Sequence, residues 1–408
     1  MQEVTRPEGG EKSLERQIRA FHWIRMLAEL PHRKAGSAGE REAGERVEAW
    51  LRDLGLEEIE RPKAPSRPHP GWNLALHLGL AALGSWLGGW SGLALVAAAT
   101  LSLWRETRTG RPGLSRWIPR RATHNVVARV GADRPRRRVV LTATLDAPTP
   151  GRLFERRFGS RLDPSVGAAR SAVVPIALLA VTSAVAASAA LGADGGAIAV
   201  ARFLVGGLCA IGSLGGLEWA RAASTPGAAD NAAGIAAMLT ATEQLAAQLP
   251  PDVELWCAAA GASQVGSAGA QALLAAHPEW LSDRTAFVHF EGLGAGELHW
   301  VQSEGGFEAV AYPPMLTELA RRVSASDAYG VVKPGTLSTD TDGQVFARAG
   351  AQVLTLTTLL PAIDPARPRE RDDLPEHVDT ELVVRAADFG CCVVSAYLRG
   401  DAEPLAYV

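Results

Sequence analysis

The sequence predicts an α/β fold in which helices cover both faces of a mostly parallel sheet, interrupted by two hydrophobic helical hairpins. Two observations predict it. Apolar strand-like segments alternate with helical segments through the polar part of the chain, a pattern typical of parallel sheets buried on both faces. Two stretches almost without charge interrupt that alternation. The 408 residues suffice for one large domain or two ordinary ones.

The polar part begins with two amphipathic helices, at 14–30 and 39–55, whose apolar residues recur every three and four positions. The segments that follow read alternately as strands and helices. Strands are expected at 124–130, 137–147, 253–260, 285–294 and 350–359, and helices at 235–249, 269–281, 312–326 and 381–400. In such sheets function usually lies in the loops that follow the strands.

The two interruptions lie at 74–104 and at 172–217, and each reads as a pair of helices. A membrane-spanning helix needs about 20 apolar residues, and both helices of the second pair meet that length. The first pair is shorter and reads as a tight hairpin, a shallow insertion or a buried element. The chain therefore divides into a polar body of 1–70, 106–170 and 221–408, with hairpin insertions at 71–105 and 171–220.

Tryptophans at the edges of these runs and glycines within them favour membrane insertion over packing on a sheet. Six arginines lie in 105–121, after the first pair, while the hairpin tips carry no positive residue. By the positive-inside bias, we expect the polar domain to face the cytoplasm at the cytoplasmic membrane. The alternative is that Ala-rich helices simply cover a sheet.

Composition excludes two classes of site. The net charge of −3 and pI of about 6.3 give no basic field for nucleic acid. The four cysteines form no CxxC or Cys/His pattern, and we expect them to be small core residues.

Polar residues follow the predicted strands where a parallel sheet would gather them. Thr144 and Asp146 follow one strand, Ser263 and Gln264 the next, and Glu291 a third. Asp230 precedes an apolar helix in "STPGAADNAAGIAAML". Taken alone, this aspartate reads as a helix cap, although a carboxylate held there could also bind a metal ion.

The order of "ADNAAGIAAML", "VHFEGLG", "GQVFARAGAQVLTL" and "DLPEHVDTELVVRAA" resembles the di-zinc exopeptidase family (peptidase family M28). That family includes bacterial aminopeptidases, glutaminyl cyclases, the transferrin receptor and nicastrin. The resemblance covers most of the polar chain and implies a three-layer hydrolase-like fold. It also implies two zinc ions bridged by an aspartate, with a glutamate acting as general base.

The resemblance assigns family positions to residues of this chain. The aspartate that follows the first His ligand falls on Asp146, the bridging aspartate on Asp230, and an acidic ligand on Glu291. Of the family's ligand positions, only those of Asp230 and Glu291 keep a plausible zinc ligand. We expect no nucleic acid partner and no cofactor.

Four positions depart from the family pattern. Thr144 stands where the first His ligand is expected, and Ser263 in place of the general base. Gln264 replaces a carboxylate ligand, and Arg369 stands at the position of the last His ligand. Arginine is never a zinc donor, so we expect Arg369 to pair with Asp230 or Glu291 in place of the metal charge.

These departures predict a membrane-associated pseudo-peptidase that binds, scaffolds or regulates, with the bilayer and a peptide or protein as partners. The alternative is an active zinc aminopeptidase with atypical ligands drawn from Asp340, Asp342, Asp372 or His289. If the chain is not such an enzyme, we expect His289 to be a packed strand residue. Asp340, Asp342, Asp372 and Asp373 are then expected to be solvated loop carboxylates. A transporter subunit, for which Arg202 would be the one intramembrane charge, is the third reading.

Overall fold

The computed structural model describes residues 8–66, 69–109, 112–150, 167–193, 195–305, 309–326, 328–359 and 373–400. Two compact units make up the chain. The first, called the sheet unit here, consists of Met1–Ser66, Ala122–Pro148 and Ser224–Val408. The second, called the helical unit, consists of Arg67–Arg121 and Thr149–Ala223. Arg369 and Asp372 lie outside the described residues.

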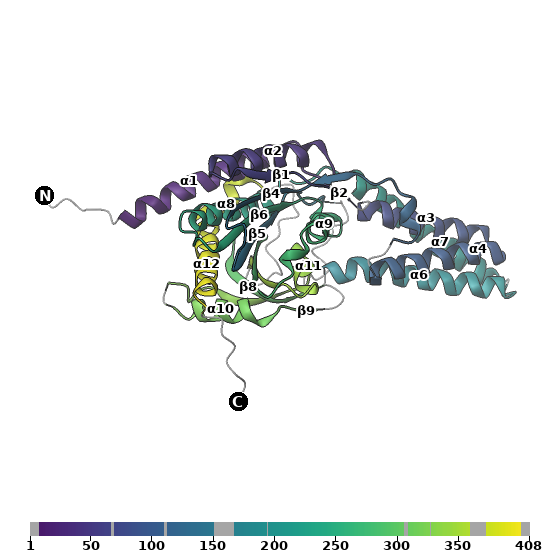
Figure 1. The fold of residues 1–408 in the computed structure, drawn as a ribbon. Helices are drawn as coiled ribbons and strands as arrows, with labels where there is room; N and C mark the ends of the chain where they lie inside the picture. Colours follow the sequence, from purple (N-terminus) through teal and green to yellow (C-terminus); the bar gives the residue numbers. More distant parts are fainter. Residues whose placement is uncertain are drawn as a thin grey trace, which may run out of the picture. The chain divides into compact units, whose positions relative to one another are not determined.

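The sheet unit is built on a mixed sheet whose central strands are parallel (Figure 1). β6, β5, β7 and β11 run parallel to one another, and antiparallel pairs flank them through β4 on one side and β8 on the other. The predicted mostly parallel sheet is thus confirmed. Its strand order is β1 (Glu58–Glu60), β4 (Val126–Gly131), β6 (Val253–Ala260), β5 (Arg137–Thr144), β7 (Thr285–Phe290), β11 (Gln352–Leu359), β8 (Glu297–Glu304) and β10 (Lys333–Leu337), with β9 (Val310–Ala311) beside β8.

Helices cover both faces of this sheet. One face carries α1 (Glu8–Ala28), α2 (Ala38–Asp53), α8 (Ala233–Ala246), α10 (Pro314–Ser324) and α12 (Thr380–Arg399). The other carries α9 (Ala268–Ala276) and α11 (Asp342–Arg348). A separate ribbon joins β2 (Lys63–Pro65) to β3 (Ala122–His124).

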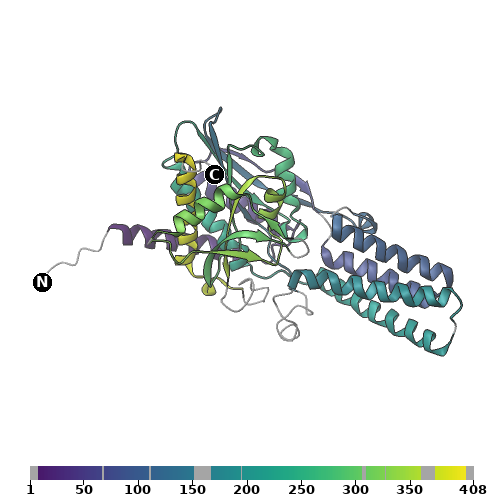
Figure 2. The same cartoon turned by 90° about the horizontal axis from the view of Figure 1, so that it is seen from below.

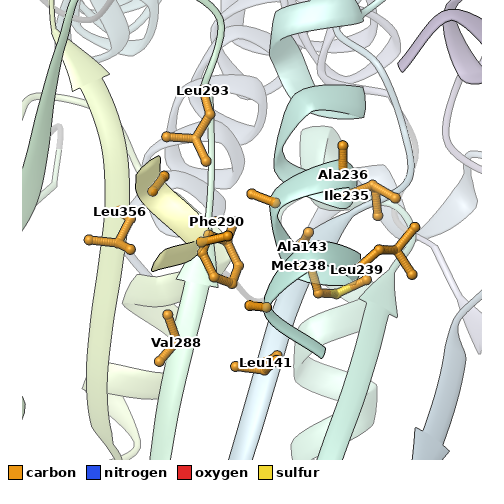
Figure 3. Close-up of a cluster of buried hydrophobic side chains, with 14 of the residues drawn as sticks. Leu141, Ala143, Ile235, Ala236, Met238, Leu239, Val288, Phe290, Leu293 and Leu356 are labelled. Carbon is orange, nitrogen blue, oxygen red and sulfur yellow. The ribbon is translucent and has the colours of Figure 1, made fainter. Parts of the chain in front are cut away.

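Strand β5 shows why these segments read as continuous apolar runs. Leu141 and Ala143 pack in the larger core against Met238 of α8, as Figure 3 shows. Val140, which precedes Leu141 in sequence, packs in the second core beneath α9 and α11. Because successive strand residues face opposite ways, burial on both faces favours apolar residues along the whole strand. The buried polar residues of β5, Thr142 and Thr144, are hydrogen-bonded.

The elements of the sheet unit that were not predicted include β8, β10 and α11. β8 reads "ELHWVQSE" and β10 reads "KPGTL", and both carry polar or turn-forming residues because they lie toward one margin of the sheet. The segment that reads as a loop before Gln344 instead begins α11 at Asp342, capped by the Thr341 hydroxyl.

The helical unit contains α3 (Pro70–Leu87), α4 (Gly89–Thr109), α6 (Gly167–Ala190) and α7 (Gly196–Arg221), with the short turn η1 (Leu114–Trp117) after α4 (Figure 2). α3 and α7 pack closely, since a Cβ at Gly216 would lie 2.7 Å from the Gly71 oxygen. Among the described residues, one helix, α7, is long and apolar enough by length and composition to cross a membrane. Only 11% of its most apolar window is buried.

Candidate functional site

The loops after β5 and β7 bring two family positions into contact. The Thr144 hydroxyl lies at the end of β5 and donates to Glu291 Oε2 at 3.4 Å. Both residues are buried, at 0% and 1% exposure. The hydroxyl that stands at the expected His position therefore serves as a hydrogen-bond donor to the retained carboxylate.

Asn231, which follows Asp230 in the sequence, also holds Glu291 in place. Its Nδ2 donates to Glu291 Oε2 at 3.1 Å and to the Phe290 carbonyl at 2.9 Å. Its Oδ1 accepts the Gly292 N–H at 3.0 Å. The Asn231 amide thus fixes the turn that carries Glu291.

His289 belongs to the same cluster. Its ring is fully buried on β7, with Nδ1 3.0 Å from the Thr142 hydroxyl and Nε2 3.5 Å from Glu291 Oε2. Burial alone would lower the pKa of His289, but the hydrogen bond and charge of Glu291 outweigh it, so its pKa is raised. The histidine is a packed strand residue that also faces the Glu291 carboxylate.

Asp146 is held by the loop after β6. Its two oxygens accept the main-chain N–H groups of Ser263 at 2.8 Å and Gln264 at 2.9 Å. The Ser263 hydroxyl donates to Asp342 Oδ1 at 2.9 Å. Burial raises the pKa of Asp146 and raises that of Asp342 to about 6.

Asp230 does not cap α8. Its backbone is non-helical (φ −120°, ψ 87°), and α8 begins at Ala233 without a side-chain cap. Asp373 holds this turn instead, because its carboxylate accepts the N–H groups of Ala229 at 2.7 Å and Asp230 at 3.4 Å. Burial raises the pKa of Asp373 to about 7.

The prediction of solvated loop aspartates is wrong for two of them. Asp342 and Asp373 are 1% and 2% exposed, because α11 and the turn before α8 enclose them. Asp340 is exposed, and its carboxylate accepts the Gln344 amide at 2.9 Å.

Arg33 is a member of the site that sequence reasoning missed. Its guanidinium is 1% exposed and donates to the carbonyls of Leu145 at 3.0 Å, Pro226 at 3.1 Å and Gly227. Burial lowers its pKa to about 10, and the nearby carboxylates oppose that shift: Asp373, Asp146 and Asp230. Arg33 remains charged at neutral pH and supplies a cation within the acidic cluster.

No local pattern in "PHRKAGSAG" distinguishes this arginine, since its partners lie 112 or more residues away in the sequence. The expected cation, Arg369, lies outside the described residues, so its pairing stays a prediction.

This arrangement places acidic groups at the carboxyl ends of parallel strands in an M28-like order. Residues 213–390 match the model of peptidase family M28. The predicted resemblance to the M28 family is confirmed.

Solved structures agree on the M28-like fold. A zinc aminopeptidase from Bacillus subtilis matches with a TM-score of 0.55 and 14% identity, over 93% of this chain and 95% of that chain. An aminopeptidase from Aneurinibacillus sp. strain AM-1 matches with a TM-score of 0.54 and 15% identity, over 96% and 97%. LapB from Legionella pneumophila matches with a TM-score of 0.53 and 12% identity, over 97% and 77%. No curated protein matches the chain. At these identities the structural likeness establishes the fold.

The M28 ligand positions can be tested for their fit to a zinc pair. Within the described ranges, no three His, Cys, Asp or Glu side chains are arranged to hold a metal ion. A hydroxyl and a neutral amide, Thr144 and Gln264, replace two ligands, and Arg33 adds a fixed positive charge to the cluster. Because zinc sites need several imidazole, thiolate or carboxylate donors, these residues do not fit a zinc pair.

Proposed function

We propose that this chain is a membrane-associated pseudo-peptidase, which keeps the exopeptidase fold without a zinc centre and acts by binding, scaffolding or regulation. The observation that carries the proposal is the buried Arg33 guanidinium among Asp146, Asp230 and Asp373. A buried carboxylate needs a compensating partner. In a zinc enzyme the metal is that partner, and here an arginine side chain takes part of that role.

The fate of the residue at the general-base position supports the same proposal. Ser263 donates its hydroxyl to Asp342, and a serine hydroxyl cannot take the place of a glutamate as general base. Activation of a serine also needs a positioned base and an oxyanion site. Within the described residues, His289 is the imidazole of this cluster, and its contacts are with Thr142 and Glu291.

Membrane association rests on the helical unit. α7 meets the length and apolarity of a spanning helix, and the side chains it exposes include Phe203, Leu204, Leu208, Ile211 and Leu214. An exposed apolar surface of this extent is typical of a lipid or protein contact. We propose the cytoplasmic membrane as its location, with the sheet unit facing the cytoplasm, from the arginines that follow α4.

The proposed transport reading has less support. Arg202 of α7 donates from Nε to the Ser85 carbonyl at 3.0 Å and from Nη2 to the Trp86 carbonyl at 3.2 Å. These carbonyls end α3, where a helix leaves acceptors unpaired and favours a cation. Arg202 thus caps the carboxyl end of α3, which accounts for its charge without a transport role.

The experiment is a zinc determination on detergent-purified protein, after exposure to excess zinc and desalting, by plasma mass spectrometry. We expect near-zero zinc per chain and no hydrolysis of aminoacyl anilides above a heat-treated control. One or two retained zinc ions, lost in Asp230→Ala but kept in the exposed-carboxylate control Asp283→Ala, would overturn the proposal and favour the active aminopeptidase.

Membrane association is tested separately by cell fractionation with an alkaline carbonate wash. Retention in the pellet supports insertion, and release into the wash contradicts it. Orientation is read from a membrane-impermeant maleimide: Ser91→Cys, in the first turn of α4, should react from outside, and Glu57→Cys should not.

A further inference from the structure

Three arginines of the helical unit stack on three tryptophans. The guanidinium carbon of Arg221 lies 5.1 Å from the centre of the Trp72 ring. Arg108 lies 5.5 Å from Trp104 in the same way, and Arg116 lies 4.8 Å from Trp117. These six residues are called the arginine–tryptophan collar here. Trp104 and Trp117 are large apolar groups left 47% and 67% exposed, so the pairs do not belong to a core.

The topology of the helical unit gathers the collar at one end. α3 and α4 form a hairpin, so the start of α3 and the end of α4 lie together. α7 runs antiparallel to α3, because Gly216 lies against Gly71 while Arg202 lies against Ser85. Trp72, Trp104 and Arg221 therefore share the same end of the bundle. Figures 1 and 2 show α3, α4, α6 and α7 running side by side.

A buried polar network fixes the turn that carries the third pair. Glu106 Oε1 accepts the N–H groups of Gly113 at 2.7 Å and Ser115 at 3.1 Å. The Ser102 hydroxyl oxygen accepts the Leu114 N–H at 2.9 Å and lies 2.8 Å from Nε2 of the buried His77. Three hydrogen bonds to side chains of α4 thus hold η1 against that helix, and Arg116 and Trp117 belong to this fixed turn.

The two ends of the bundle differ in charge. In the described part of the chain, the collar end carries six exposed arginines against Glu218 and the hydrogen-bonded Glu106: Arg105, Arg108, Arg116, Arg120, Arg121 and Arg221. At the other end, Arg202 donates to helix carbonyls. Guanidinium groups bind phosphate oxygens in a planar, two-pronged geometry, and tryptophans favour the depth of lipid headgroups.

We infer that the collar binds the phosphate groups of anionic phospholipids at one leaflet. The inference rests on the proposed membrane association and adds the lipid class. Three arginines stacked beside interfacial tryptophans present a positive ring of fixed geometry. Each arginine near an anionic surface strengthens binding by roughly fivefold, so the three collar arginines together give a preference on the order of 100-fold over a zwitterionic lipid.

The experiment is native mass spectrometry of the full chain in mild detergent, incubated with equal amounts of phosphatidylglycerol and phosphatidylcholine. We expect phosphatidylglycerol adducts to exceed phosphatidylcholine adducts at least tenfold. The variant Arg108→Gln/Arg116→Gln/Arg221→Gln should bring the two lipids to near parity. The matched control is Arg25→Gln/Arg321→Gln/Arg385→Gln, which removes three exposed, ion-paired arginines of the sheet unit and should keep the native preference.

The outcomes separate this inference from the proposed function. The native chain could bind phosphatidylglycerol and phosphatidylcholine equally and still stay in the membrane after the carbonate wash. That result would overturn lipid binding by the collar but not membrane association. Release from membranes overturns both. If the glutamine variant does not fold, the lysine variant at the same three positions keeps the charge and should retain the preference; its loss of preference while folded contradicts a phosphate site.

Discussion

Nη1 of Arg33 donates to the main-chain oxygen of Leu145 at 3.0 Å. Through Nη2 the same guanidinium reaches the carbonyls of Pro226 and Gly227, so it ties the end of β5 to the turn before α8. The buried guanidinium is stabilised by the carboxylates and carbonyl oxygens around it, and these groups would lose their cation if it were removed. The acidic cluster and the buried arginine therefore form one electrostatic unit.

We expect Arg33→Gln to destabilise the protein by about 3 kcal/mol or more, because it leaves buried carboxylates and carbonyls without their cation. Thermal and chemical denaturation in mild detergent measure this. The control Arg321→Gln removes an exposed arginine paired with Glu318 at 2.7 Å and should have no measurable effect. Equal stability of the two variants would show that Arg33 is not required by the cluster.

The second prediction concerns pH. Burial raises the folded-state pKa of Glu40 to about 7, and that of Asp373 to about 7, so the folded chain binds protons that the unfolded chain has released. This contribution is fully present below the unfolded pKa values of about 4 and is lost as pH rises through about 7. Stability should therefore increase by on the order of 1 to 3 kcal/mol from about pH 8 to about pH 5.

Melting temperatures across that range provide the measurement. Glu40 accepts hydrogen bonds from Thr123 and Ala262, both at 2.8 Å, and its replacement by glutamine removes the titration while keeping the shape. Glu40→Gln should show a flatter pH profile than the native chain. A native profile that rises with pH instead would contradict the buried, proton-binding carboxylates.

Asn231 supports the third prediction. The chain that follows β7 depends on it for a hydrogen bond at each of Phe290, Glu291 and Gly292. Asn231→Ala should cost about 2 to 4 kcal/mol, because all of these groups are buried and would lose a partner. Gln271→Ala, on the exposed side of α9, is the control and should change the free energy of unfolding by less than about 0.5 kcal/mol. Comparable losses in both variants would argue against Asn231 as the support of this turn.

The sequence allows the regular parts of the fold to be predicted where periodicity is strong. β6 spans Val253–Ala260, the stretch "VELWCAAA", and apart from Glu254 its residues are apolar, as expected for a strand buried on both faces. β8 could not be found in this way, since Glu297 and Gln302 interrupt its pattern and its place comes from antiparallel pairing with β11. Pairing across the sheet is a tertiary choice that local sequence does not encode.

The candidate site was likewise predictable from the sequence only in part. Thr144 and Glu291 were expected to lie together because both follow parallel strands, and they do. Arg33 and Asp373 were missed as members, because each reaches the cluster from a segment with no periodic signal. What identifies them is burial of a charge, which depends on the packing of distant segments.

The last prediction concerns the contact between α3 and α7. An added Cβ at Gly216 would lie 2.7 Å from the Gly71 oxygen and 2.9 Å from the Ala75 nitrogen, both of them main-chain atoms of α3 that cannot move aside alone. Gly216→Val should therefore push the two helices apart and lower the melting temperature of the protein in detergent. Gly207→Val is the matched control, because the same helix leaves open space at Gly207. A crosslink between cysteines at Ala75 and Ser213, whose hydroxyl donates to the Ala75 carbonyl at 2.8 Å, reports the contact directly. It should form in Gly207→Val and fail in Gly216→Val, and efficient crosslinking in both would show that α3 and α7 do not depend on this close approach.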